Sequence, residues 1–239
     1  MDTAISDILA MCYHKVGIFG KTFMPEAFST PLSELHLQMN ALLDSPAQKI
    51  AIAAPRGLGK TTTAKAIVIA GILYRDYEFI TYVSNSEAQA MMQTENIKRE
   101  LMSGPEIRKI FGSIKVDTTD SEMDESFSKH SWVCFGNTLI MPRGSGQQVR
   151  GLLYRNFRPQ LIVVDDLEDK LELENPENRR KLKDWFYSDL VRSVDRYSNK
   201  WRIIYIDTLK HSEALLQELI TSSDWESLRL EICDDEYNS

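Results

Sequence analysis

The sequence predicts an α/β fold, with helices covering a mostly parallel central sheet. Three observations support this prediction. Four short apolar runs have the length of buried strands, at 49–54, 79–84, 160–165 and 201–207. Segments with helical spacing of apolar residues separate these runs, as in βαβ units. The run QLIVVD at 160–165 is apolar almost throughout, which is typical of a strand covered on both faces.

The chain before the first predicted strand forms a helical part. We expect residues 1–48 to be an N-terminal lid or subdomain and residues 49–239 to be the α/β core. Prolines punctuate the first part, and Leu35, Met39 and Leu42 give it an apolar stripe at helical spacing.

The core elements follow in order after the first strand. An Ala- and Ile-rich segment at 60–75 predicts a helix, and Ser84 and Ser86 are N-caps for a second helix that runs to about Met102. Residues 113–130 are acidic and polar, so we expect an exposed loop there.

The second half of the core begins with a predicted hairpin. Residues 131–135 and 138–142 flank Gly136-Asn137, a common hairpin turn. Pro176 opens a predicted helix to about Val194, since proline is favoured in the first helical turn. A further helix is expected to begin near Ser212.

Composition excludes several classes of protein. The formal net charge is −7, whereas a constitutive nucleic-acid binder is usually basic, so any DNA contact must be local, transient or helped by another domain or subunit. No apolar run approaches the roughly 18 residues of a membrane span, and no signal peptide is visible. Cys12, Cys134 and Cys233 lie far apart and form no disulfide framework, which fits a reducing cytoplasm.

A phosphate-binding loop follows the first predicted strand. Residues 54–61 read APRGLGKT and match the pattern GxxxxGK[ST], except that Ala54 replaces the first glycine. Glycines let backbone N–H groups turn toward phosphate, and the next helix aims its positive end there. Lys60 can reach the β- and γ-phosphates, and Thr61 can ligate Mg²⁺. We expect ATP to contact Pro55, Arg56, Gly57, Leu58, Gly59, Lys60, Thr61 and Thr62.

Carboxylates end the apolar strand at 160–165. A strand-end aspartate holds Mg²⁺ in enzymes with such a loop, and Asp165 fits that role. A carboxylate beside it can polarise the attacking water, and both Asp166 and Glu168 are candidates. The alternative interpretation is that these acids cap a loop and pair with Arg179 or Arg180.

Three motifs in order resemble those of phage terminase large subunits. Residues 53–61 are similar to the family's Walker A motif, and residues 149–151 and 158–169 to its segment leading into Walker B. Asp207-Thr208 is similar to the coupling motif, with Asp207 where relatives usually carry glycine. The resemblance spans about residues 15–232 and implies a P-loop ATPase of the additional-strand type, whose cofactors are ATP and Mg²⁺.

The resemblance also implies partners and further site residues. It implies a motor on double-stranded DNA that forms a homo-oligomeric ring on the portal protein of a procapsid, with a small terminase subunit, in the host cytoplasm. Given the charge, we expect a monomer in isolation. Arg150 is implied as an arginine finger acting in trans, and Arg56 is a competing candidate in cis. Thr208 is either a nucleotide sensor or a helix cap.

Two other functions remain open on the sequence. One is a nucleotide-dependent assembly module with little turnover, which Asp166 in place of glutamate allows. The other is a different P-loop remodelling ATPase, such as a helicase, although no strand-separating motif is visible. The 31 residues after Thr208 are too few for the RNase H-like nuclease of full-length relatives, so we expect a motor fragment without DNA cleavage.

Overall fold

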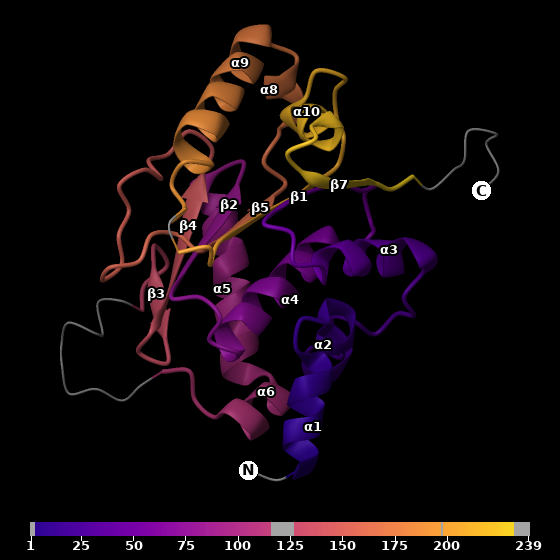
Figure 1. Ribbon diagram of the computed structural model, residues 1–239, viewed down its shortest axis with the longest axis vertical. Helices are drawn as coiled ribbons and strands as arrows, with labels where there is room; N and C mark the ends of the chain where they lie inside the picture. The colour runs from indigo at the N-terminus through magenta and orange to yellow at the C-terminus, as the bar shows by residue number, and fades with distance from the viewer. Residues whose placement is uncertain (1–2, 116–126, 197, 232–239) are drawn as a thin grey trace.

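The computed structural model describes residues 3–115, 127–196 and 198–231 (Figure 1). Its centre is a 7-stranded sheet in the order β3-β4-β2-β5-β6-β1-β7. Among the strands of the described residues, only β3 pairs in antiparallel fashion, so the predicted mostly parallel sheet is confirmed. The strands are β1 (Lys49–Ala53), β2 (Phe79–Ser84), β3 (Trp132–Cys134), β4 (Thr138–Gly144), β5 (Leu161–Asp165), β6 (Arg202–Asp207) and β7 (Glu226–Arg229).

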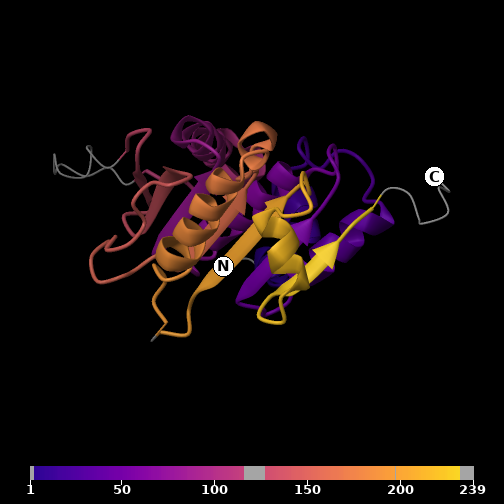
Figure 2. The same cartoon turned by 90° about the horizontal axis from the view of Figure 1, so that it is seen from above.

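Helices precede the sheet and connect its strands. The first three are α1 (Thr3–Cys12), α2 (Val16–Phe23) and α3 (Glu34–Leu43). The rest are α4 (Lys60–Leu73), α5 (Glu87–Ser103), α6 (Pro105–Phe111), α8 (Lys170–Leu173), α9 (Pro176–Trp185), the π-helical turn η1 (Phe186–Leu190) and α10 (Leu215–Thr221). Figures 1 and 2 both show α9 and α10 side by side, next to one end of the sheet. No helix among the described residues is both long and apolar enough to cross a membrane.

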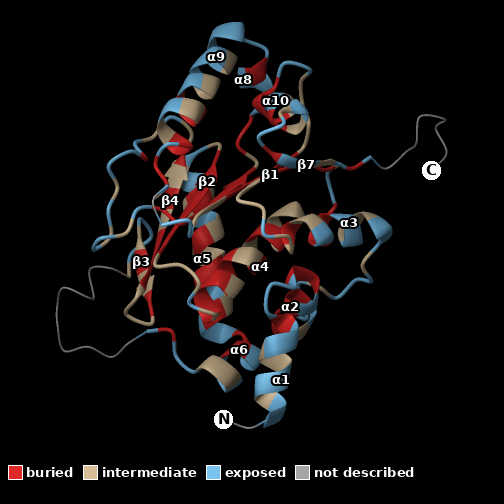
Figure 3. Ribbon diagram, viewed as in Figure 1, coloured by how far each residue is buried: buried red, intermediate tan, exposed pale blue. Residues whose placement is uncertain are grey.

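The sheet separates two apolar layers, because successive side chains of a strand point to opposite faces. Ile50 and Ile52 of β1 pack in a core with α2 and α4. Ala51 and Ala53 face the other layer, which η1 and α10 cover. Figure 3 shows the central strands of the sheet buried along most of their length, whereas the outer faces of α1, α3 and α9 are exposed. The sheet is therefore covered on both faces, as the apolar strands predict.

The order of the strands places β6 between β1 and β5. Ala53 at the end of β1 lies opposite Asp207 of β6, and Asp165 at the end of β5 lies opposite Ile206. A strand inserted between the phosphate-loop strand and the acidic strand is the arrangement that defines the additional-strand type. This part of the fold prediction is also confirmed.

Some element boundaries differ from the prediction. The helix expected at 176–194 is α9 followed by η1, where Val191 N–H donates to Phe186 O at 2.9 Å. This wider turn keeps Phe186 in the core, where its ring packs against that of Tyr205. The helix expected from Ser212 begins at Leu215. The polar strand β7 and the short helices α6 and α8 have no strong apolar pattern and were not predicted.

Two predictions fall partly on positions that the structure does not describe. Most of the loop expected at 113–130 lies outside the described residues, and so does Cys233. Cys12 and Cys134 are both buried free thiols.

Candidate nucleotide site

The predicted phosphate loop connects β1 to α4. Gly57 and Gly59 have φ angles of 83° and 68°, in the left-handed region that glycine adopts without strain. Ala54 donates its N–H to Asp207 O at 2.9 Å and has no positive φ, so alanine fits where the motif has glycine. Because α4 begins at Lys60, its N-terminal amides face the same space as the loop.

A cavity of about 380 Å³ opens where this loop meets the ends of β5 and β6. It brings together groups that are about a hundred residues apart in the chain, as expected for parallel strands whose carboxyl ends share one edge. Its lining residues are Arg56, Gly57, Lys60, Thr61, Asn85, Gln89, Asp165, Asp166, Glu168, Asp169, Lys170, Thr208 and Lys210.

The ammonium group of Lys60 points to the mouth of the loop. It donates to Ala54 O at 3.1 Å, to Pro55 O at 2.8 Å and to Thr208 Oγ1 at 2.8 Å. Burial lowers the pKa of Lys60, while the charges of Asp207 and Asp166 oppose that shift. Its partners are neutral oxygens, which a phosphate group can replace with a stronger, charge-assisted interaction.

The Asp165 side chain has the features expected of a ligand for a cation. The side chain is almost fully buried, and Tyr82 donates its hydroxyl to Oδ2 at 2.8 Å. The other oxygen, Oδ1, is buried without a hydrogen-bond partner. Burial raises the pKa of Asp165, and hydrogen bonds from the Tyr82 and Thr61 hydroxyls act in the opposite direction. An orphaned carboxylate oxygen beside a hydroxyl fits Mg²⁺, which prefers one or two such ligands together with phosphate oxygens.

Asp166 projects into the cavity from a backbone position with φ of 52°. Its Oδ1 accepts from Lys210 Nζ at 2.6 Å, and its Oδ2 accepts a longer hydrogen bond of 3.4 Å from Gln89 Nε2. Burial alone would raise the pKa of Asp166, but the hydrogen bond and charge of Lys210 bring it below the usual value. The lowered pKa favours the ionised form of the carboxylate, and the long contact to Gln89 leaves Oδ2 able to accept a further hydrogen bond from water.

Glu168 has a different environment from Asp166. It is 2% exposed, and its two oxygens accept from the backbone N–H groups of Leu215 at 2.6 Å and Leu216 at 3.0 Å. These bonds satisfy the first amides of α10 and explain why that helix begins at Leu215. Although Glu168 borders the cavity, both of its oxygens are already engaged.

The predicted arginines separate into two groups. Arg56 is exposed and borders the cavity within its own chain. Arg150 is outside that cavity, and its side chain, 62% exposed, pairs with Asp189 of η1 at 3.6 Å.

The strand-end acids do not pair with Arg179 or Arg180, contrary to the alternative interpretation. Arg179 contacts Glu213, while Arg180 pairs with Glu177 and Asp184 of its own helix.

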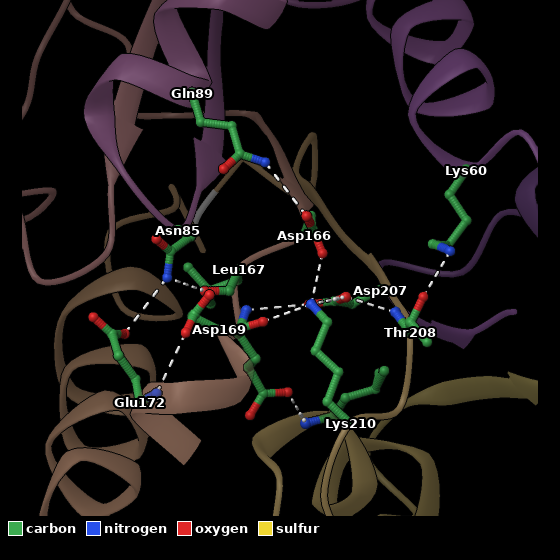
Figure 4. Close-up of polar contacts among 12 residues, drawn as sticks. Lys60, Asn85, Gln89, Asp166, Leu167, Asp169, Glu172, Asp207, Thr208 and Lys210 are labelled. Carbon is green, nitrogen blue, oxygen red and sulfur yellow. Dashed lines mark hydrogen bonds and ion pairs between the residues drawn. The ribbon is translucent and has the colours of Figure 1, made fainter. Parts of the chain in front are cut away.

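Sequence reasoning missed Lys210. Figure 4 shows its ammonium group between the Asp166 and Asp207 carboxylates, near the contact of Lys60 with Thr208. No motif marks a lysine three residues after a strand-end aspartate, so only the fold reveals it. Asn85 was also missed; its side-chain amide donates to Leu167 O at 3.3 Å, next to the acidic strand end.

Comparisons with known proteins agree with this fold. No protein-family model and no curated protein matches the sequence. Among solved structures, the large terminase ATPase domain of Thermus phage P74-26 matches with a TM-score of 0.57 and 10% identity, over 85% of this chain and 82% of that domain. An arginine-to-alanine mutant of the same domain matches with a TM-score of 0.56 and 9% identity, over 86% and 83%. The chain therefore shares the fold of a phage large terminase ATPase domain.

Proposed function

We propose that this chain is a Mg²⁺-dependent ATPase that acts as the motor domain of a terminase large subunit. The observation that carries the proposal is that Lys60, Thr61 and Asp165, with its unpartnered oxygen, line one cavity. The loop beside this cavity contains two glycines with left-handed backbone conformations. These are the groups that bind phosphate and the metal ion in P-loop enzymes.

Each residue has a distinct part in this proposal. The backbone of residues 55–59 surrounds the phosphates, and Lys60 exchanges its carbonyl partners for the β- and γ-phosphates. Thr61 and Asp165 would hold Mg²⁺, which would supply positive charge beside the phosphate oxygens. Asp166 accepts a hydrogen bond from the attacking water through Oδ2. The geometry favours Asp166 over Glu168, because both Glu168 oxygens are bonded to α10.

The link to DNA rests on the three ordered motifs together with the terminase-like fold. In this proposal, ATP hydrolysis drives double-stranded DNA into a procapsid. The chain works in a homo-oligomeric ring on the portal protein with a small terminase subunit, in the host cytoplasm. Residues 1–48 are the helical subdomain and residues 49–239 the ATPase core. Arg150 reaches a neighbouring subunit, and Thr208 senses the nucleotide through Lys60.

A second candidate is a nucleotide-dependent assembly module with little turnover. One observation favours it: Lys210 occupies an oxygen of Asp166, so the carboxylate needed for hydrolysis is partly engaged. Steady-state phosphate release at high protein concentration distinguishes the two functions, because only the motor turns over many ATP molecules.

The central experiment replaces the phosphate-binding lysine. Lys60→Ala should remove Mg²⁺-dependent phosphate release and leave the fold intact, since the ammonium group is only half-buried and bonds neutral oxygens. Lys181→Met, on the exposed face of α9, is the control and should behave as the wild type. Undiminished turnover by a folded Lys60→Ala variant would reject the proposed site.

A further inference from the structure

Lys210 is a largely enclosed cation at the edge of the cavity. Its side chain is 10% exposed, and its ammonium group lies 2.6 Å from Asp166 Oδ1, 2.8 Å from Asp207 Oδ1 and 2.5 Å from Glu168 O. A buried ammonium has three donors to satisfy. All three therefore have acceptors, and two of these acceptors are carboxylates from the ends of adjacent strands.

The anchor of this lysine is the residue that departs from the terminase pattern. Asp207 is fully buried at the end of β6, and one of its oxygens also accepts from Glu168 N–H at 3.1 Å. Glycine at this position would offer Lys210 no carboxylate. Asp207 and Lys210 therefore form one unit, fixed to β6, that reaches across to the residue following β5.

The lysine leaves the two oxygens of Asp166 in unequal surroundings. Oδ1 is bonded to the ammonium at 2.6 Å, while Oδ2 accepts a longer hydrogen bond of 3.4 Å from Gln89 Nε2. An isolated carboxylate rotates about its last torsion, which is broad. A strong bond to one oxygen restricts that rotation and keeps the other oxygen in a fixed direction.

We propose that Lys210 is a positioning residue, which holds Asp166 so that Oδ2 faces the attacking water. The inference rests on the proposed ATPase function and adds a residue that the P-loop motifs do not contain. Its proposed effect on the chemical step passes through Asp166, so the loss of kcat on removing Lys210 should appear only while Asp166 is present, whereas its contacts with Asp207 and Glu168 O contribute to the fold.

The test combines Lys210→Met with Asp166→Asn. Lys210→Met should bind an ATP analogue as the wild type does and lower kcat by about 10²-fold, a loss that a misplacement of about 1 Å can cause. In single-turnover measurements with radiolabelled ATP, the double variant should be as slow as Asp166→Asn alone. Lys181→Met again serves as the matched control for loss of a lysine.

A conservative variant covers the case in which Lys210→Met does not fold. Lys210→Arg keeps the charge and can still donate to Asp166, so its kcat should exceed that of Lys210→Met. If Arg and Met variants are equally slow while both remain folded, positioning by this cation is refuted. Rate losses of Lys210→Met and Asp166→Asn that multiply would also refute it, because the lysine would then act elsewhere.

Crystal structures separate this inference from the proposed function. In Lys210→Met without nucleotide, the Asp166 carboxylate should leave its wild-type position. A carboxylate that stays in place overturns the inference even if the wild type hydrolyses ATP. Conversely, a wild type that releases no phosphate rejects the ATPase proposal, while the position of Asp166 still decides the role of Lys210.

Discussion

The Arg150→Ala substitution tests whether Arg150 contributes to the stability of the fold or to the rate of ATP hydrolysis. The Arg150 side chain is 62% exposed and pairs with Asp189 at 3.6 Å. An ion pair of this kind contributes at most about 1 kcal/mol to stability. An arginine finger, in contrast, accelerates hydrolysis by ~10³-fold or more, which corresponds to roughly 4 kcal/mol of the barrier. The variant should thus melt almost as the wild type does, bind ATP normally and hydrolyse it very slowly.

The assay is phosphate release over a range of protein concentrations. If Arg150 acts on a neighbour, the specific activity of the wild type rises with concentration, and Arg150→Ala stays slow throughout. A mixture of Arg150→Ala and Lys60→Ala should regain activity, because the second variant still offers Arg150 to an intact site. A concentration-independent wild-type rate without recovery in the mixture would refute action in trans and leave Arg56, which borders its own cavity, as the candidate.

Four further predictions concern the acids of the site. Asp165→Asn should weaken nucleotide binding in the presence of Mg²⁺, as measured by titrations with and without the metal. If the variant and the wild type bind the nucleotide with equal affinity in the presence of Mg²⁺, the prediction is wrong. Asp166→Asn should bind ATP without hydrolysing it, whereas Glu168→Gln should mainly lower the free energy of urea unfolding, by about 1–3 kcal/mol, because a buried acceptor of two amides is altered. Burial raises the pKa of Asp207 to about 7, so the folded protein binds that proton more tightly than the unfolded chain does. Its stabilising effect is complete at acid pH and lost as the pH rises through about 7. Between acid pH and about pH 7, the free energy of urea unfolding should therefore change less with pH for Asp207→Asn than for the wild type.

Much of the fold could be predicted because its strands are apolar on both faces. The four runs that form β1, β2, β5 and β6 lie in the middle of the sheet, where burial dictates their composition. The edge strand β7 is largely exposed and carries polar side chains, so composition gives no signal for it. The turn from α9 into η1 was missed because it depends on packing of Phe186 against β6 rather than on local propensity.

Some residues of the site could likewise be predicted from the sequence, and others could not. Lys60, Thr61 and Asp165 could be predicted, because phosphate and Mg²⁺ demand particular groups at particular strand ends. The relative standing of Asp166 and Glu168 could not, since it depends on α10, whose first amides engage Glu168. Charge partners across the cavity, such as Lys210 for Asp166, follow from which strands are neighbours and have no fixed spacing in the chain.

The adjacency of β1, β6 and β5 has a consequence for how such a chain can vary. Two alignments of neighbouring backbones bring the strand ends of the site together, Ala53 opposite Asp207 and Asp165 opposite Ile206. The connections between these strands leave the sheet and return to it, so their lengths and compositions can change without moving either alignment. Insertions between residues 112 and 131, far along the chain from both alignments, should be tolerated more readily than a single-residue deletion within β6. A deletion there would shift the strand end that carries Asp207 and Thr208 relative to the lysine of the phosphate loop.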